Sequence, residues 1–493
     1  MPDWYGDHKF MMIPAQPFHR PFARLPVLPV MTLLLRSTTG LVRAAAALLL
    51  ALVVASASVV AAHAQSVPVV RDAEIEALVR DYARPIFKAA GLSKSGIDII
   101  LVNDQRFNAF VAGRRMFINT GALLQAGTPN EIIGVIAHEA GHIAGGHQDR
   151  LREQIARAQT MAVISSLLGV GAMVAGAATD TGGLASAGAG LMAGGTEAAR
   201  RGLLGYQRSE ESAADQSAIR YLEATGQSGN GMLVTFERFQ SALSLSGTKV
   251  DPYQLSHPTP RDRIANLETL VKSSPHFGNK DSEALQQRHD MMRAKIAVYT
   301  QGQAAASRLF KKMPGSLAAQ YGEAQAALLF GNPRNALKKA DALIKIQPKN
   351  PYFQELRGDV LLRANEPEKA AEAYARAVQL DPAKSGILQI SYGQALIATG
   401  KTESLKKAVN VIQEGLSRDK ENFNGYAYLA QAYGQLGEVP EAELATAEGY
   451  YYGGNYQQAK IFAMRAQQKF KRGAPGWVRA QDIINYKTPK KKK

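Results

Sequence analysis

Residues 128–142 read Thr-Pro-Asn-Glu-Ile-Ile-Gly-Val-Ile-Ala-His-Glu-Ala-Gly-His, and this stretch decides the fold around it. Its first four residues form a capping box with proline at the first helical position, and the apolar run that follows predicts a buried helix. His138 and His142 share one face of that helix, so they can bind one zinc ion, and Glu139 can act on a metal-bound water. The alternative is a surface helix with two satisfied histidines. Burial of three unpaired polar groups is costly, which favours the metal site.

A catalytic zinc needs a third protein ligand, and two candidates follow the helix. On a continuing helix His147 points about 140° away from His142, which favours a role in ordering the helix end. The better candidate is Glu211, in a helix-like run over residues 200–225, because a glutamate from a second helix completes a His-His-Glu site. Asp215 lies one turn further on, where it can accept a hydrogen bond from a ligating imidazole. A solvated acidic face is the alternative for this pair.

Residues 256–264 form a third informative segment, Ser-His-Pro-Thr-Pro-Arg-Asp-Arg-Ile. Two prolines stiffen this loop, and His257 stands at its front. Three roles are open for His257. It binds the substrate or the oxyanion, it occupies the open metal position and keeps an enzyme latent, or it is a packed loop histidine.

These segments, in this order, resemble the zinc peptidases that include the bacterial HtpX proteases and the Ste-type CAAX proteases. The resemblance covers residues 68–270. It rests on the H-E-x-x-H helix, the E-x-x-x-D pair, the H-P-x-x-x-x-R-I loop and residues 108–121, which are similar to the family's N-A-F strand and the edge strand before the helix. A signal peptide and helical repeats make the chain most similar to the periplasmic BepA-like members.

The resemblance implies a site of the gluzincin type with one zinc ion. His138, His142 and Glu211 would bind the metal, Glu139 would be the general base and Asp215 would support the site. The catalytic site would also include His257, which matches the loop histidine that the family places near the metal.

The resemblance further implies an endopeptidase in quality control of outer-membrane proteins, which degrades misassembled proteins while a repeat module recruits clients or the assembly machinery. Two other functions stay open. One is a chaperone-like adaptor whose protease domain is latent, and the other is a membrane-integrated processing protease.

Composition excludes several classes of protein. The chain of 493 residues has no cysteine, which excludes disulfides, a cysteine nucleophile, thiolate zinc ligands and an acylated lipoprotein anchor. The net charge is +16, but no basic strip with interleaved aromatic residues indicates a nucleic-acid partner. A basic exported protein can instead associate peripherally with anionic membrane surfaces.

The N-terminus predicts export to the periplasm. Arg36 and Arg43 precede an apolar run over residues 44–62, and Ala62-His63-Ala64 forms an A-x-A cleavage site. We expect cleavage after Ala64. Because the first 30 residues are long for a signal peptide, translation can also begin at Met31. An uncleaved anchor over residues 44–62 is the alternative.

Between these motifs, helical spacing over residues 72–95 is followed by a strand at 97–102, and the catalytic helix is expected over 129–146. A strand at the edge of a small sheet can hold an extended substrate through backbone hydrogen bonds. Residues 161–178 carry no charge, and glycine-rich sequence continues to residue 195. Four structures fit this segment: a buried hairpin, a lid over the zinc, an element that touches the membrane, or a true span. We favour a lid or hairpin that dips against membrane or unfolded substrate.

The C-terminal half has a period of 34 residues, in which Ala324 and Ala336 are answered by Gly358 and Ala370. This spacing resembles the tetratricopeptide repeat, with about four units that stack into a curved array. The predicted fold class is α+β, mainly α: a zincin-like metallopeptidase domain with a small sheet, plus an α-solenoid. The expected divisions are a signal peptide with an N-terminal extension (1–64), the peptidase domain (68–275), a helical linker (276–314), the repeats (315–475) and a basic tail (476–493).

Overall fold

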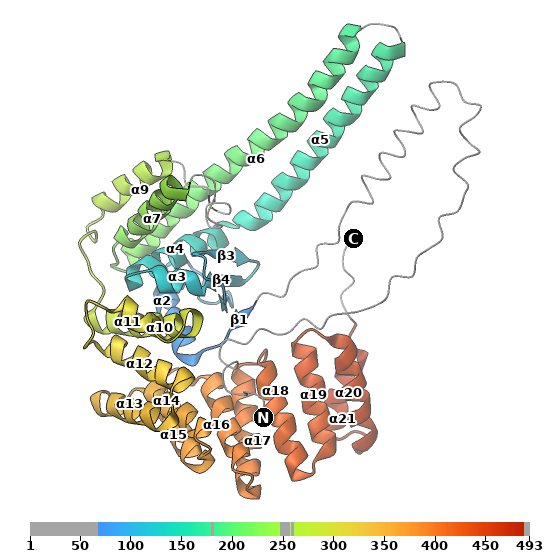
Figure 1. Cartoon of the computed structure of the whole chain (residues 1–493). Helices are drawn as coiled ribbons and strands as arrows, with labels where there is room; N and C mark the ends of the chain where they lie inside the picture. The colour runs from blue at the N-terminus through green and yellow to red at the C-terminus, as the bar shows by residue number, and fades with distance from the viewer. Residues whose placement is uncertain (1–67, 179–181, 247–256, 258–260, 488–493) are drawn as a thin grey trace. The chain divides into compact units, whose positions relative to one another are not determined.

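The computed structural model describes residues 68–178, 182–246, 257 and 261–487. The predicted signal peptide, its cleavage site after Ala64, the alternative start at Met31 and the last six residues lie outside these ranges. The predicted fold class is confirmed, because the described chain is mainly helical and contains one small mixed sheet (Figure 1).

The sheet has four strands in the order β1-β2-β4-β3. Strand β4 (Arg115–Asn119) pairs in parallel with β2 (Asp98–Val102) and antiparallel with β3 (Ala109–Ala112), while β1 (Val69–Val70) lies on the far side of β2. The strand before the H-E-x-x-H motif, β4, is therefore interior, which corrects the expectation that it forms the edge. The edge strand on this side is β3.

Helix α4 (Pro129–Gly145) carries the H-E-x-x-H motif and is buried over most of its length. It begins at the predicted capping box, in which Glu131 accepts a hydrogen bond from the backbone N–H of Thr128 at 3.1 Å. It ends because Gly146 takes the left-handed conformation, with φ of 65°. Gly141 allows close approach to a second helix, since a Cβ there would lie 2.9 Å from the carbonyl oxygen of Ala214.

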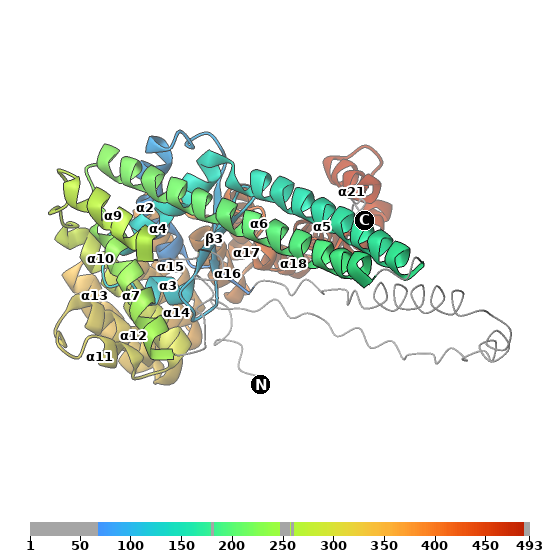
Figure 2. The ribbon, with the colours of Figure 1, turned by 90° about the horizontal axis from the view of Figure 1, so that it is seen from above.

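Helices α5 (His147–Ala178) and α6 (Gly182–Ala224) form a long antiparallel hairpin directly after α4 (Figures 1 and 2). The inner half of α6 packs beside α4, whereas most described side chains of the outer half of the hairpin are exposed or half-buried. A buried hairpin, one of the four structures considered for this segment, is therefore wrong for the described part.

Other helices complete the core around α4. They are α2 (Ala73–Ala89), α3 (Thr120–Gln125), α7 (Asn230–Ser246), α9 (Arg261–Ser273), α10 (Glu283–Gln301) and α11 (Ala305–Leu309). Helix α2 is shorter than the helical spacing over 72–95 suggested, because the chain turns at Gly91 with φ of 72°. Buried residues of α2, α4, α7 and α10 share one hydrophobic cluster with the sheet, so α4 lies on a rigid base.

The C-terminal half consists of helix pairs that begin at residues 317, 351, 386, 423 and 456, close to the predicted period of 34 residues. Tyr374 illustrates the packing within a pair, because a Cβ at Gly358 would lie only 2.7 Å from its ring. The described residues contain five pairs where the sequence spacing indicated about four. The helices are α12 (Leu317–Phe330), α13 (Pro333–Ile346), α14 (Pro351–Arg363), α15 (Pro367–Leu380), α16 (Gly386–Ala398), α17 (Thr402–Arg418), α18 (Phe423–Leu436), α19 (Val439–Tyr452), α20 (Tyr456–Lys469) and α21 (Pro475–Asn485).

Candidate metal centre

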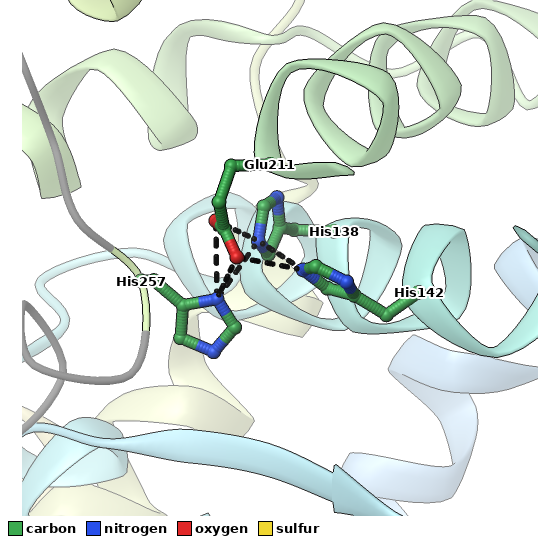
Figure 3. A group of neighbouring side chains, drawn as sticks. All are labelled: His138, His142, Glu211 and His257. Atoms are coloured by element: carbon green, nitrogen blue, oxygen red, sulfur yellow. Dashed lines mark hydrogen bonds and ion pairs between the residues drawn. The ribbon is translucent and has the colours of Figure 1, made fainter. Parts of the chain in front are cut away.

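Four buried side chains from three separate segments converge on one point: His138 and His142 of α4, Glu211 of α6 and His257 (Figure 3). One nitrogen or oxygen atom from each lies within 4.8 Å of all the others. Nε2 of His138 is 3.1 Å from Nε2 of His142, and each is 3.3 Å from an oxygen of Glu211. The structure thus brings together the two helices that the sequence analysis singled out.

Asp215 and Arg263 hold one side of this cluster. Oδ1 of Asp215 lies 2.9 Å from Nδ1 of His138, so a proton on Nδ1 leaves the lone pair of Nε2 directed at the cluster. Arg263 of α9 donates a hydrogen bond to Asp215 at 2.9 Å and forms an ion pair with Glu211 at 2.8 Å. Burial raises the pKa of Asp215, but its interactions with Arg263 and His138 together bring that pKa below its ordinary value, so this carboxyl stays ionised.

His147 and Glu210 hold the other side. Nδ1 of His147 is 2.9 Å from Nδ1 of His142, and Nε2 of His147 is 2.9 Å from Oε2 of Glu210. When His147 donates from Nε2 to Glu210, its Nδ1 can accept from His142, whose Nε2 lone pair then faces the cluster. Arg150 of α5 also binds Glu210, at 2.7 Å. Burial lowers the pKa of His142 to about 4, so its imidazole is neutral near pH 7.

The carboxyl group of Glu139 is fully buried, yet neither oxygen makes a hydrogen bond to any residue that the structure describes. Its nearest charged or ionisable contact is Nε2 of His257, at 3.4 Å from Oε1. Burial raises the pKa of Glu139 above its ordinary value. A buried, unbonded carboxylate beside two imidazole nitrogens and a second carboxylate fits a metal ion and the water it would bind.

The donor set also decides which predicted residues lie in the cluster. His138, His142, Glu211 and His257 form it, Glu139 borders it and Asp215 supports it. His147 contributes no donor atom to the cluster, but it contacts His142 instead of pointing away from it, because the helix ends at Gly146 and His147 begins α5. Arg263 and Glu210 were not among the predicted site residues, although Arg263 is the arginine of the H-P-x-x-x-x-R-I loop.

Comparison with known proteins agrees with this geometry. Residues 69–271 match the model of peptidase family M48, and residues 299–351 and 321–385 match a tetratricopeptide repeat model. The chain is 24% identical over 421 residues to the beta-barrel assembly-enhancing protease of Escherichia coli K12, covering 83% of this chain and 82% of that protein. A putative beta-barrel assembly-enhancing protease of Vibrio cholerae is 26% identical over 416 residues, with the same two coverages. The chain is thus a metalloprotease that carries a peptidase family M48 domain followed by tetratricopeptide repeats.

Proposed function

We propose that the chain is a zinc-dependent endopeptidase in which His138, His142 and Glu211 bind one zinc ion and Glu139 is the general base. The observation that carries this proposal is the convergence of those three donors beside a buried carboxylate without hydrogen bonds. Two imidazoles and one carboxylate are a ligand set of catalytic zinc sites. We assign catalysis to residues 68–275 and recruitment to the repeats at 315–475, joined by residues 276–314.

Zinc, when bound, supplies the Lewis acidity that makes water a nucleophile near neutral pH and polarises a carbonyl. The protein's own groups do the rest. Glu139 takes the proton from the attacking water and returns it to the leaving amine, and its raised pKa suits both transfers. Asp215 and His147 keep the two imidazoles in the tautomer that binds metal, and Arg263 fixes the orientation of Glu211.

We infer that the clients are misfolded or misassembled outer-membrane proteins in the periplasm. The names of the relatives support this inference, because they describe proteases that enhance the assembly of β-barrels. Unfolded β-strands suit a small sheet whose edge strand, β3, lies beside the catalytic helix. The repeats would recruit these clients or the assembly machinery, since stacked helix pairs form extended binding surfaces.

A latent resting state is favoured by the position of His257. Its Nδ1 lies 3.0 Å from Glu211 and 3.4 Å from Nε2 of His138, among the other donor atoms. With His257 as a fourth ligand, a tetrahedral zinc would have no open position for substrate. The adaptor function, with a mostly latent protease, remains the second candidate because of this contact.

Replacing His257 separates its two roles. If it blocks the metal, we expect His257→Ala to raise casein hydrolysis several-fold, with metal content unchanged, and His276→Ala to have no effect. A fall in hydrolysis at unchanged metal content would instead assign His257 to substrate or oxyanion binding.

Replacing Glu211 tests the ligand set. We expect Glu211→Gln to weaken zinc binding by more than the roughly 10- to 100-fold typical of residues that support a ligand. The measurement is the metal content of protein purified without chelator, followed by titration with a competing zinc dye. Glu223→Gln, on the same helix α6, is the matched control and should bind zinc normally. Unchanged occupancy in Glu211→Gln would show that the third ligand is another residue.

A further inference from the structure

The outer half of the α5–α6 hairpin, residues 158–178 of α5 and 182–196 of α6, exposes large apolar side chains. Leu167 and Leu168 are 68% and 61% exposed. On a helical wheel they spread, together with three exposed neighbours, over about 160° of α5, where the stripe that faces one protein core is at least about 100° wide. Leu191 on α6 adds to this surface at 51% exposure. The three neighbours on α5 are Met161, Val163 and Ile164.

Charge is rare in the same part of the sequence, where Asp180 is the one charged residue between Arg157 and Glu197. Residues 158–178 of α5 and 182–196 of α6 contain no Asp, Glu, Lys or Arg. At about 1.5 Å per residue the stretch in α5 is about 30 Å long, which is the thickness of a bilayer's hydrocarbon core. By length and composition, the stretch His147–Met173 is the one candidate for crossing a membrane in the described chain, and little of it is buried.

A group of four arginines marks where the uncharged stretch ends. Arg152 and Arg157 lie on α5, Arg200 and Arg201 lie on α6, and their side chains are 63–77% exposed. Their acidic partners are Asp149, Glu153 and Glu197. Long basic side chains at this position can keep their apolar stems in lipid and their charges at phosphate headgroups.

Helices α5 and α6 contact each other through small residues. A Cβ at Gly188 would lie 2.5 Å from the carbonyl oxygen of Gly169, and a Cβ at Gly195 would lie 2.1 Å from Oγ of Ser165. Close packing through glycine is how helices associate where water is absent. Glycine is also a poor helix former in water, whereas in hydrocarbon the backbone must bond to itself. This composition therefore suits lipid better than water.

We propose that the outer half of the α5–α6 hairpin inserts into a phospholipid bilayer, up to the level of the four arginines. A bilayer covers every outward face of both helices, whereas a protein partner would cover one stripe. The inference goes beyond the proposed protease function and does not depend on it.

The first test is flotation of the full mature chain with vesicles of phosphatidylethanolamine and phosphatidylglycerol. The wild-type chain should float with the vesicles, and Leu167→Asp combined with Leu168→Asp should lower the bound fraction at least tenfold. The control combines Phe330→Asp with Ile346→Asp. These two apolar side chains of the repeats are also exposed, at 52% and 53%, and the control should float like the wild-type chain. Circular dichroism and casein hydrolysis should be unchanged in the hairpin variant.

Three outcomes would overturn the proposal. The first is no flotation of the wild-type chain, and the second is flotation of the hairpin variant as strong as that of wild type, since lipid would then bind elsewhere. The third is a hairpin variant that loses only self-association or casein binding, because the exposed surface would then serve a second copy or an unfolded client.

The second test measures depth with a single fluorescent label. Because the chain contains no cysteine, Leu168→Cys and Gln159→Cys each give one attachment site. With vesicles, a polarity-sensitive dye at residue 168 should shift to the blue and be quenched by nitroxides deep in the acyl chains. The dye at residue 159, beside the arginines, should be quenched by headgroup nitroxides. A dye at residue 168 that stays in water would contradict insertion, whether or not the protein cleaves casein.

Discussion

Casein hydrolysis should fall by about 100- to 10,000-fold in Glu139→Gln, the range typical of losing a general base. The amide has nearly the same shape as the carboxyl group but cannot take a proton from water. Since Glu139 is not in the group of metal donors, zinc content should stay at the wild-type level. The measurement is the rate of casein hydrolysis per bound zinc.

The same variant separates the protease from the adaptor. Glu76→Gln on α2 is a control, because that carboxylate pairs with arginines outside the metal centre. Both the Glu139→Gln variant and the wild-type chain are expressed in a strain that lacks this protein. If the variant restores the integrity of the cell envelope as well as the wild-type chain does, the adaptor is the main function. A hydrolysis rate equal to that of wild type would remove Glu139 from the mechanism.

Lys295→Met should destabilise the chain by roughly 3–5 kcal/mol, the usual cost of removing one partner from a buried ion pair. The Lys295 side chain is fully buried in α10, with Nζ 2.7 Å from Asp72 and 3.1 Å from Glu74. Tyr321 of α12 donates a hydrogen bond to the same Glu74 oxygen, at 2.7 Å. The change therefore leaves two buried carboxylates without their cation, at the point where α2, α10 and α12 meet.

Urea unfolding followed by circular dichroism measures this loss. Lys339→Met is the matched control, because its partner Glu323 lies 2.7 Å away but the two side chains are 34% and 46% exposed. An exposed pair of this kind contributes about 0–1 kcal/mol. Equal unfolding midpoints for the two variants would show that the carboxylates near Lys295 find other partners or take up protons.

Much of the geometry of the candidate metal centre could be predicted because its signals are local. The capping box predicts where α4 begins, and the spacing of His138 and His142 puts both on one face. The direction of the His147 side chain could not be predicted from spacing, because spacing gives a direction only if the helix continues past His142. The helix instead ends at Gly146, so His147 begins α5 and turns back toward His142. A Cβ at Gly145 would lie 2.2 Å from Nε2 of His147, so this return needs a glycine.

Features that depend on contacts between distant segments could not be predicted from the sequence. Strand β4 pairs with β2 across a parallel crossover, and no local pattern states which strand becomes the edge. Lys295 forms an ion pair with Glu74, which lies 221 residues away in the sequence. The residues next to Lys295 in the sequence do not indicate that it is buried beside carboxylates. Likewise Arg263 reaches Glu211 and Asp215 only because α9 packs against α6.

Helix α6 runs without interruption from Gly182 to Ala224, so one rod carries both Arg201 and Glu211. The separation of these two residues is about 15 Å along the axis, at 1.5 Å per residue. A continuous helix neither stretches nor shortens appreciably. If the arginines bind lipid headgroups, α6 holds the scissile bond at a fixed distance from the lipid surface. That distance would decide which part of a membrane-bound client can be cleaved.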